Sequence, residues 1–226
     1  MDSEVRQTMT SNLPKKGEFF ELRPDARRRG KGHGVVFENE SSLKTPPNFL
    51  LRPDQGGFPP LRETPRLVYC PSEGWPPEDL EAGMSGYWLV SGRLREVMAA
   101  VDPGAFAFRE TAYRLADGAM GGPYFLCDVI RTIDALDEAA SHLKIIVSDD
   151  YEEGKYYDLT GDARLAFKRE AIVDAHVFRL PYYEGVFCDH IFKNAVEGAG
   201  IVTARTCNGL WFEDVVNCWA RRSSED

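Results

Sequence analysis

Two Cys-Asp pairs are the first residues in this chain whose types could support chemistry. Cys127 and Asp128 end the apolar run YFLCD, and Cys188 and Asp189 recur later in VFCDH. A cysteine nucleophile needs a thiolate beside a base, with a third group that orients the base. The spacing therefore raises the question of whether either pair belongs to an active site.

Three histidines, His142, His176 and His190, could act as the base. Cys188 is the better nucleophile candidate, because a position at a helix start would favour the thiolate. Cys127 lies inside an apolar run, where burial raises the pKa of a thiol. No signature of a cysteine hydrolase accompanies these residues, so no catalytic residue is assigned. An enzyme that uses Cys188 and His190 remains the alternative.

A second candidate site is the acidic stretch DDYEEGKYYD. A hydrolytic pair or a magnesium site requires carboxylates that converge in a cleft, whereas this composition predicts an exposed loop followed by a strand edge. Acidic groups interleaved with tyrosines suit a protein partner rich in Lys and Arg, and an ordinary solvated turn is the alternative. The candidate binding residues are Asp149, Asp150, Tyr151, Glu152, Glu153 and Tyr156.

Charge and cysteine usage limit the class of protein. The net charge is −9, and the acidity is concentrated after residue 70, where 15 Lys and Arg face 27 Asp and Glu. Such a field repels nucleic acid and favours a basic partner. The five cysteines are widely spaced and include no C-x-x-C pair, so neither a disulfide framework nor a zinc site is predicted. No metal and no cofactor is expected.

No targeting or membrane segment is evident. The first twenty residues are polar and lack the apolar core of a signal peptide. No apolar run approaches the roughly 20 residues that cross a bilayer. The chain is therefore expected in the cytosol.

The elements that must position these residues are short. Leu94, Val97, Met98 and Val101 follow the i, i+3, i+4, i+7 spacing of a helix, which Asp102-Pro103 ends. Asp189 can cap a second helix over 190–200, with Ile191, Phe192, Ala195 and Val196 on its inner face. The segment 209–220 is predicted to be a closing helix. Strands are predicted within 34–40, 105–115, 122–131, 143–148, 156–159, 164–167, 175–180 and 201–207.

This order of elements predicts an α+β fold, with a mainly antiparallel sheet of short strands and a few packed helices. Nine of the fourteen prolines fall between Pro46 and Pro77, which indicates an irregular, loop-rich N-terminal part. Two regions are expected: a proline-rich region over 1–85, packed on or forming a small lobe beside the main domain, and an α+β domain over 86–226.

Four blocks in order resemble a bacterial immunity-protein family, first catalogued as a domain of unknown function and later placed among the antidotes of polymorphic toxin systems. The resemblance covers roughly 86–205, and the first 85 residues match it less clearly. The blocks are GYWLVSGRLREVMAAVDPGAFAF, YFLCDVIRTIDALDE, KYYDLTGDARLAF and DAHVFRLPYYEGVFCDHIFKNAVEGAGIVTAR.

The resemblance implies an antitoxin with no catalytic activity. Such a protein would be encoded beside a toxin, bind it in the cytosol, and protect the producing cell in contact-dependent or type VI secretion competition. The two Cys-Asp pairs would then mark a strand end and a helix start. If the toxin has a basic cleft, acidic loops such as 149–153 would cover it.

Overall fold

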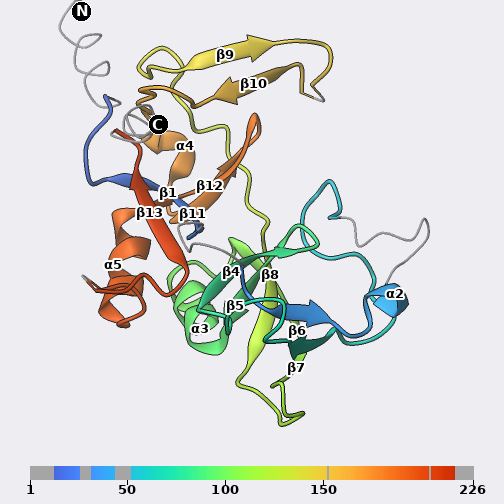
Figure 1. Cartoon of the computed structure of the whole chain (residues 1–226). Helices are drawn as coiled ribbons and strands as arrows, with labels where there is room; N and C mark the ends of the chain where they lie inside the picture. The colour runs from blue at the N-terminus through green and yellow to red at the C-terminus, as the bar shows by residue number, and fades with distance from the viewer. Residues whose placement is uncertain (1–12, 26–31, 44–51, 152, 204, 217–226) are drawn as a thin grey trace, which may run out of the picture. The chain divides into compact units, whose positions relative to one another are not determined.

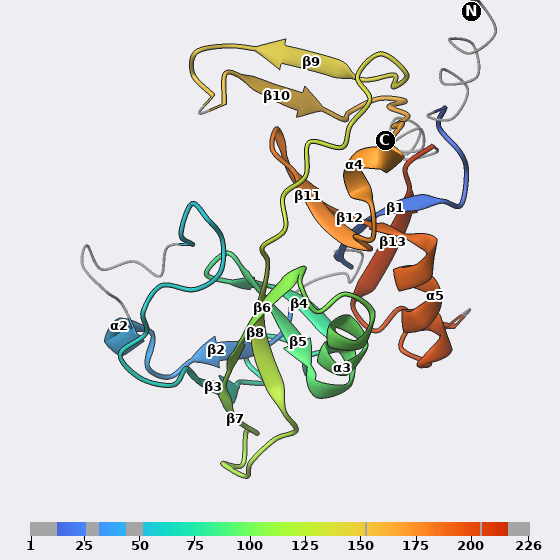
Figure 2. The same cartoon turned by 180° about the vertical axis from the view of Figure 1, so that it is seen from behind.

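The computed structural model describes residues 13–25, 32–43, 52–151, 153–203 and 205–216. They form short, mostly antiparallel strands with short helices, which confirms the predicted α+β class (Figures 1 and 2). The chain divides into two compact units. Unit 1 comprises 1–22, 132–193 and 212–226, and unit 2 comprises 23–131 and 194–211. The predicted division into 1–85 and 86–226 stays a prediction.

Unit 1 is built on a four-stranded sheet in the order β11-β12-β1-β13. Strand β12 lies between β11 and β1 and runs antiparallel to both, with Cys188 opposite Val177 on one side and Phe20 on the other. The sheet strands are β11 (Val177–Leu180), β12 (Tyr183–Asp189), β1 (Phe19–Pro24) and β13 (Leu210–Asp214). The unit also holds the hairpin strands β9 (Lys144–Val147) and β10 (Lys155–Asp158), and helix α4 (Arg169–Ile172).

The core of unit 1 is aromatic. Phe167 packs against Phe19, Phe178 and Phe187, with ring centroids 4.9 to 5.5 Å apart. Tilted and edge-to-face pairs at this spacing add to the free energy gained by burial. The same cluster includes Tyr157 of the hairpin, so β10 is part of the core of this unit.

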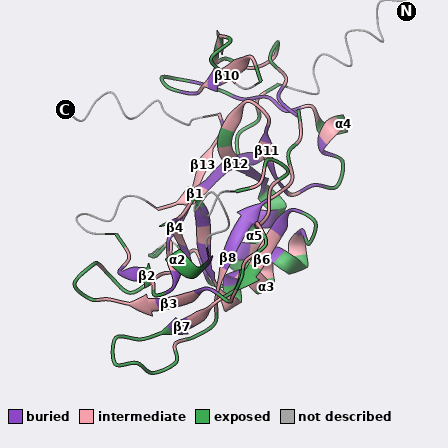
Figure 3. Cartoon of the chain, turned by 90° about the vertical axis from the view of Figure 1, so that its right-hand side faces the viewer, coloured by how far each residue is buried: buried purple, intermediate pink, exposed green. Residues whose placement is uncertain are grey.

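Unit 2 contains a four-stranded sheet in the order β4-β5-β8-β6 and a three-stranded sheet in the order β2-β3-β7. The apolar run around Cys127 forms the interior strand β8, as predicted, and Figure 3 shows most of it buried. The strands are β2 (Val35–Phe37), β3 (Arg66–Tyr69), β4 (Leu80–Met84), β5 (Tyr87–Ser91), β6 (Phe106–Glu110), β7 (Ala112–Arg114) and β8 (Tyr124–Val129). The helices are α2 (Glu40–Leu43) and α3 (Gly92–Val101).

Two helices begin at capping residues, of which Asp189 was predicted from the sequence and Ser91 was not. Ser91 accepts a hydrogen bond from the Leu94 backbone N–H at the start of α3. Asp189 accepts one from the Phe192 N–H, 3.0 Å away, at the start of α5 (His190–Gly198). Each cap satisfies a backbone donor that the first helical turn leaves free. Ile191 was predicted on the inner face of α5 but is 46% exposed, because Phe192 and Val196, one turn apart, take the buried positions.

Three other predicted elements are wrong. The segment 164–167 makes only isolated bridges, Arg164 with His142 and Phe167 with Leu136, because its apolar side chains fill the core without a continuous partner strand. The described residues of 201–207 form no strand. In the predicted closing helix, residues 210–214 form β13 instead, where aromatic Trp211 and Phe212 suit a strand beside β1.

Candidate functional site

The acidic stretch forms the turn of the β9–β10 hairpin in unit 1. Val147 pairs with Lys155, and the turn between them spans Ser148–Gly154. The backbone N–H of Tyr151 donates to the Ser148 carbonyl, and that of Gly154 donates to the Tyr151 carbonyl. Gly154 has a φ of +74°, a conformation that glycine adopts without strain. These bonds give the turn a defined shape.

The predicted binding residues lie together on this turn. Asp149, Asp150 and Glu153 are exposed, and Asp150 exchanges hydrogen bonds with Ser148. Glu152 lies outside the described residues. The structure therefore brings the described carboxylates to one acidic tip that faces solvent.

Two of the tyrosines form a stacked pair beside the acids. The rings of Tyr151 and Tyr156 are 5.6 Å apart with an interplanar angle of 21°, and Tyr183 lies 6.3 Å from Tyr156. Burial, and then the negative charge of Glu184, raise the pKa of Tyr156. Stacked aromatic rings offer a partly ordered apolar surface, which lowers the entropy cost of contact with a partner. We call the described residues of this turn, 148–151 and 153–154, together with Tyr156, the acidic tip.

The hairpin is attached to its unit by a charged contact that the sequence did not reveal. Glu138 accepts hydrogen bonds from Lys155 Nζ at 2.5 Å and from the Tyr157 hydroxyl at 2.6 Å. Lys155 also lies over the ring of Tyr182, 4.1 Å from its centroid. The Tyr157 N–H donates to the Tyr182 carbonyl. Lys155 and Tyr157 lie 17 and 19 residues from Glu138 along the chain, so no local pattern indicates this contact.

We expect this contact to make hairpin stability depend on pH. The hydrogen bond from Lys155, followed by that from Tyr157, lowers the pKa of Glu138 below its usual value of about 4.5. The contact thus stabilises the fold at neutral pH, and the contribution is lost as the pH falls through the lowered pKa. Because the Glu138 side chain is 40% exposed, Glu138→Gln should cost only about 0.5–1 kcal/mol at pH 7.

Thermal unfolding of the wild type and Glu138→Gln at pH 7 and pH 3 checks this expectation. The difference in Tm should be present at pH 7 and nearly absent at pH 3. A difference that is larger at pH 3 would contradict the assignment of the Glu138 contact.

Asp128 of the first Cys-Asp pair has a structural partner in unit 2. Its carboxylate accepts two bonds from Arg52 Nε, at 2.9 and 2.8 Å, and one from the Gly57 N–H at 2.6 Å. Gly56 and Gly57 both have φ near +80°, which lets this N–H approach the carboxylate. Asp128 therefore fixes the loop that precedes Phe58, and Cys127 beside it is buried.

The second pair offers no reactive thiol. Cys188 is fully buried within β12, and burial raises the pKa of its thiol well above the ordinary value, with the Asp189 carboxylate adding to the effect. Asp189 is occupied as the cap of α5, and its Oδ2 lies 2.8 Å from Nδ1 of His176. His190 is exposed at the first position of the helix. Burial and a raised pKa both disfavour the thiolate that the enzyme alternative needs as its nucleophile.

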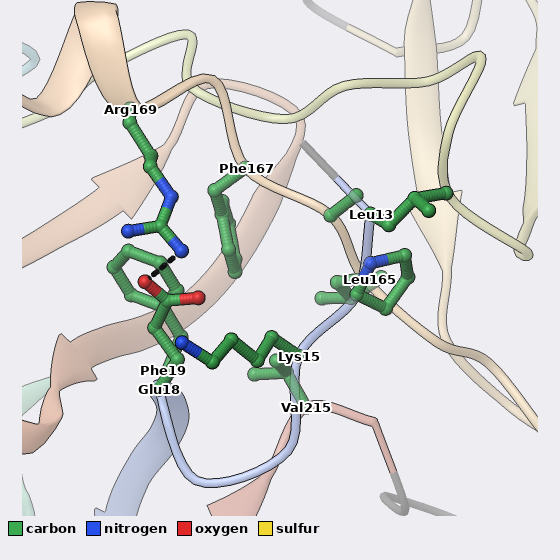
Figure 4. Close-up of a pocket in the computed structure, with 10 residues that line it drawn as sticks. Leu13, Lys15, Glu18, Phe19, Leu165, Phe167, Arg169 and Val215 are labelled. Atoms are coloured by element: carbon green, nitrogen blue, oxygen red, sulfur yellow. Dashed lines mark ion pairs between the residues drawn. The ribbon is translucent and has the colours of Figure 1, made fainter. Parts of the chain in front are cut away.

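A small pocket in unit 1 is also unsuited to a substrate (Figure 4). Phe19, Phe167 and Leu165 line it, and the ion pair of Glu18 with Arg169 lies at its rim. Its interior volume is about 10 Å³, room for about one water molecule. Ligand pockets are usually hundreds of Å³.

The described residues contain neither a metal-binding cluster nor a helix that could span a membrane. Within the part of the chain that the structure describes, no group of three or more His, Cys, Asp or Glu is placed to hold a metal ion. In that same part, no helix is long and apolar enough to cross a bilayer.

Comparison with known families decides the class of protein. A family model described as the immunity protein family Imm11 matches residues 18–217. The chain belongs to the Imm11 immunity protein family. Its role is that of an immunity protein, and membership implies binding to a cognate toxin. A search of curated proteins found no match.

The Imm11 match is wider than the resemblance over 86–205 predicted. It starts at residue 18, just before β1, and ends at 217, after β13. The match therefore also includes residues 18–85, which lie outside the four blocks. Within this early part, β1 lies between β12 and β13 in the sheet of unit 1.

Proposed function

We propose that this Imm11 protein binds its cognate toxin directly in the cytosol and neutralises it at a fixed stoichiometry, with the acidic tip covering a basic cleft of the toxin. The observation that carries the proposal is the acidic tip itself, an exposed acidic turn with stacked tyrosines on a chain of an immunity family. The toxin is the product of the gene beside this one, in a polymorphic toxin system of the kind delivered by contact or by type VI secretion.

The charges of the chain support a basic partner. With a net charge of −9, the protein repels nucleic acid phosphates and attracts cationic protein surfaces. Complementary charge raises the association rate and selects the partner, while buried aromatic contacts slow dissociation. The proposal needs no cofactor, no nucleic acid and no membrane.

The burial of Cys188 supports binding over the alternative of an enzyme that reverses the toxin's modification or removes its product. An immunity enzyme would protect at catalytic amounts, whereas a neutralising protein must match the toxin molecule for molecule. The deep burial of the Cys188 thiol argues against its use as a nucleophile and therefore against the Cys188/His190 alternative.

Titration of the purified protein into the neighbouring toxin tests the proposal. Complex formation by calorimetry and residual toxin activity are followed in the same samples. We expect both to reach their end point at the same fixed ratio. Cys188→Ala should inhibit with the same end point, because the thiol takes no part.

Two outcomes would overturn the proposal. Inhibition at amounts far below the toxin concentration would indicate catalysis, most directly if Cys188→Ala abolished it. Full protection of cells without any detectable complex would indicate that the protein acts on something other than the toxin.

A further inference from the structure

The outer edge of strand β9 carries backbone groups that point away from its partner β10. The Ser148 N–H donates to the Gly154 carbonyl at 3.2 Å, so Ser148 and Gly154 face each other as a hydrogen-bonded pair. In an antiparallel ladder, bonded and non-bonded pairs alternate. Ile146 and Tyr156 are therefore the next bonded pair, and the N–H and C=O groups of Ile145 and Val147 point outward.

The other strand of the hairpin confirms this alternation. Tyr157 is opposite Ile145, and its N–H points away from β9, toward the Tyr182 carbonyl at 2.9 Å. At Tyr157, the outward N–H of β10 is thus bonded within unit 1. Among the residues that the structure describes, no backbone group is bonded to the outward N–H and C=O groups of Ile145 and Val147.

The side chains at this edge are apolar and exposed. Val147 is 79% exposed and Ile145 is 36% exposed, and both lie on one face of the strand. Figures 1 and 2 show β9 as the outer strand of its pair, with β10 on the side of the sheet of unit 1. Sheet edges in natural proteins are usually covered, charged or interrupted, because an open apolar edge invites another strand.

The charges around the β9 edge indicate what charge a partner strand should carry. The exposed carboxylates Asp149, Asp150 and Glu153 follow immediately at the end of β9. At the other end, Lys144 lies 3.5 Å from Asp158. A strand laid along β9 would therefore meet an excess of negative charge at its turn end, which favours Lys or Arg there.

We propose that the β9 edge is the docking site for an extended segment of the cognate toxin, which adds to the hairpin as a third strand and places basic side chains against the acidic tip. Main-chain hydrogen bonds to Ile145 and Val147 would provide affinity, and the acidic tip would favour a segment with basic side chains. This inference rests on the proposed function and adds the mode of contact.

Val147→Pro tests the docking site against the matched control Val147→Thr. Proline removes an N–H that the hairpin does not use, and edge positions of this kind tolerate it. Threonine keeps both the N–H and the branched shape. We expect Kd for the neighbouring toxin to rise at least tenfold for Val147→Pro and less than threefold for Val147→Thr, with both variants folded by circular dichroism.

If Val147→Pro disturbs the hairpin, Val147→Lys provides a second test of the docking site. It keeps the backbone donor but puts a cation where the basic segment would lie, and should also weaken binding at least tenfold. Hydrogen exchange in the wild-type complex is a direct measurement. The amides of Ile145 and Val147 should exchange at least tenfold more slowly in the complex than in the free protein.

The outcomes separate this inference from the proposed function. The docking site would be overturned if the β9 substitutions left the affinity unchanged and the amides of Ile145 and Val147 exchanged equally fast in the complex and in the free protein. Stoichiometric neutralisation would then still stand. Self-association that Val147→Pro abolishes would assign the edge to a second copy of the chain and overturn the inference. Absence of any complex with the toxin would contradict the proposed function itself.

Discussion

Replacing Asp149, Asp150, Glu152 and Glu153 together by Ser is expected to slow association with the toxin by about 10- to 100-fold at low salt. The described carboxylates of this set are exposed on the turn of the β9–β10 hairpin, where they act on an approaching basic surface before contact. Because exposed charges are screened by salt, the difference between variant and wild type should shrink as ionic strength rises from about 0.01 M to 1 M.

A matched control separates local charge from net charge. Asp162, Glu170, Asp174 and Glu110 are exposed acids outside the acidic tip, and their replacement by Ser changes the net charge by the same amount. Stopped-flow association rates at several salt concentrations give the comparison. Equal slowing by both sets would mean that only the overall charge matters, and no slowing by the tip variant would remove the tip from the interface.

Local patterns predicted the elements whose signals lie within a few residues. The i, i+3, i+4, i+7 spacing around Leu94 gave α3, the apolar run at Cys127 gave the interior strand β8, and Asp189 gave the cap of α5. Each of these depends on contacts within one turn or on the burial of one strand. The acidic turn was also predicted as an exposed loop, because its local composition is enough to indicate one.

Structural features that depend on residues far apart along the chain could not be predicted from the sequence. Residues 210–214 have an apolar pattern that also fits a helix, and only their place beside β1 decides for a strand. The roles of Glu138 and Asp128 depend on Lys155 and Arg52, which lie far from them along the chain. The free side of β9 is likewise a property of the assembled sheets, because a strand pattern does not show which edge stays open.

Asp128→Ala is expected to lower the free energy of unfolding by about 2–4 kcal/mol. The Asp128 side chain is 1% exposed and holds both Arg52 Nε and the Gly57 N–H. Removing the carboxylate leaves these donors without their acceptor in a mostly buried site. The cost falls short of that for a fully buried ion pair, because Arg52 is 35% exposed and can turn toward water.

The effect should reach the apolar core of unit 2 through the loop that Asp128 holds. Phe58 stacks on Tyr87 with ring centroids 4.5 Å apart, and the Tyr87 hydroxyl donates to the Gly57 carbonyl at 3.1 Å. Burial, and secondly the charge of Asp128, raise the pKa of Tyr87 to about 12. Loss of Asp128 should therefore both loosen this stack and lower the pKa of Tyr87.

Urea unfolding and ultraviolet titration of the tyrosines measure the two effects, with a double-mutant cycle between Arg52→Ala and Asp128→Ala as the control. If the carboxylate acts through Arg52, the double variant should be less destabilised than the sum of the single ones. Because the carboxylate has this structural role, Asp128→Ala should still inhibit the toxin at the wild-type ratio wherever it is folded. A stable Asp128→Ala protein that had lost inhibition would instead return the Cys127-Asp128 pair to the functional site.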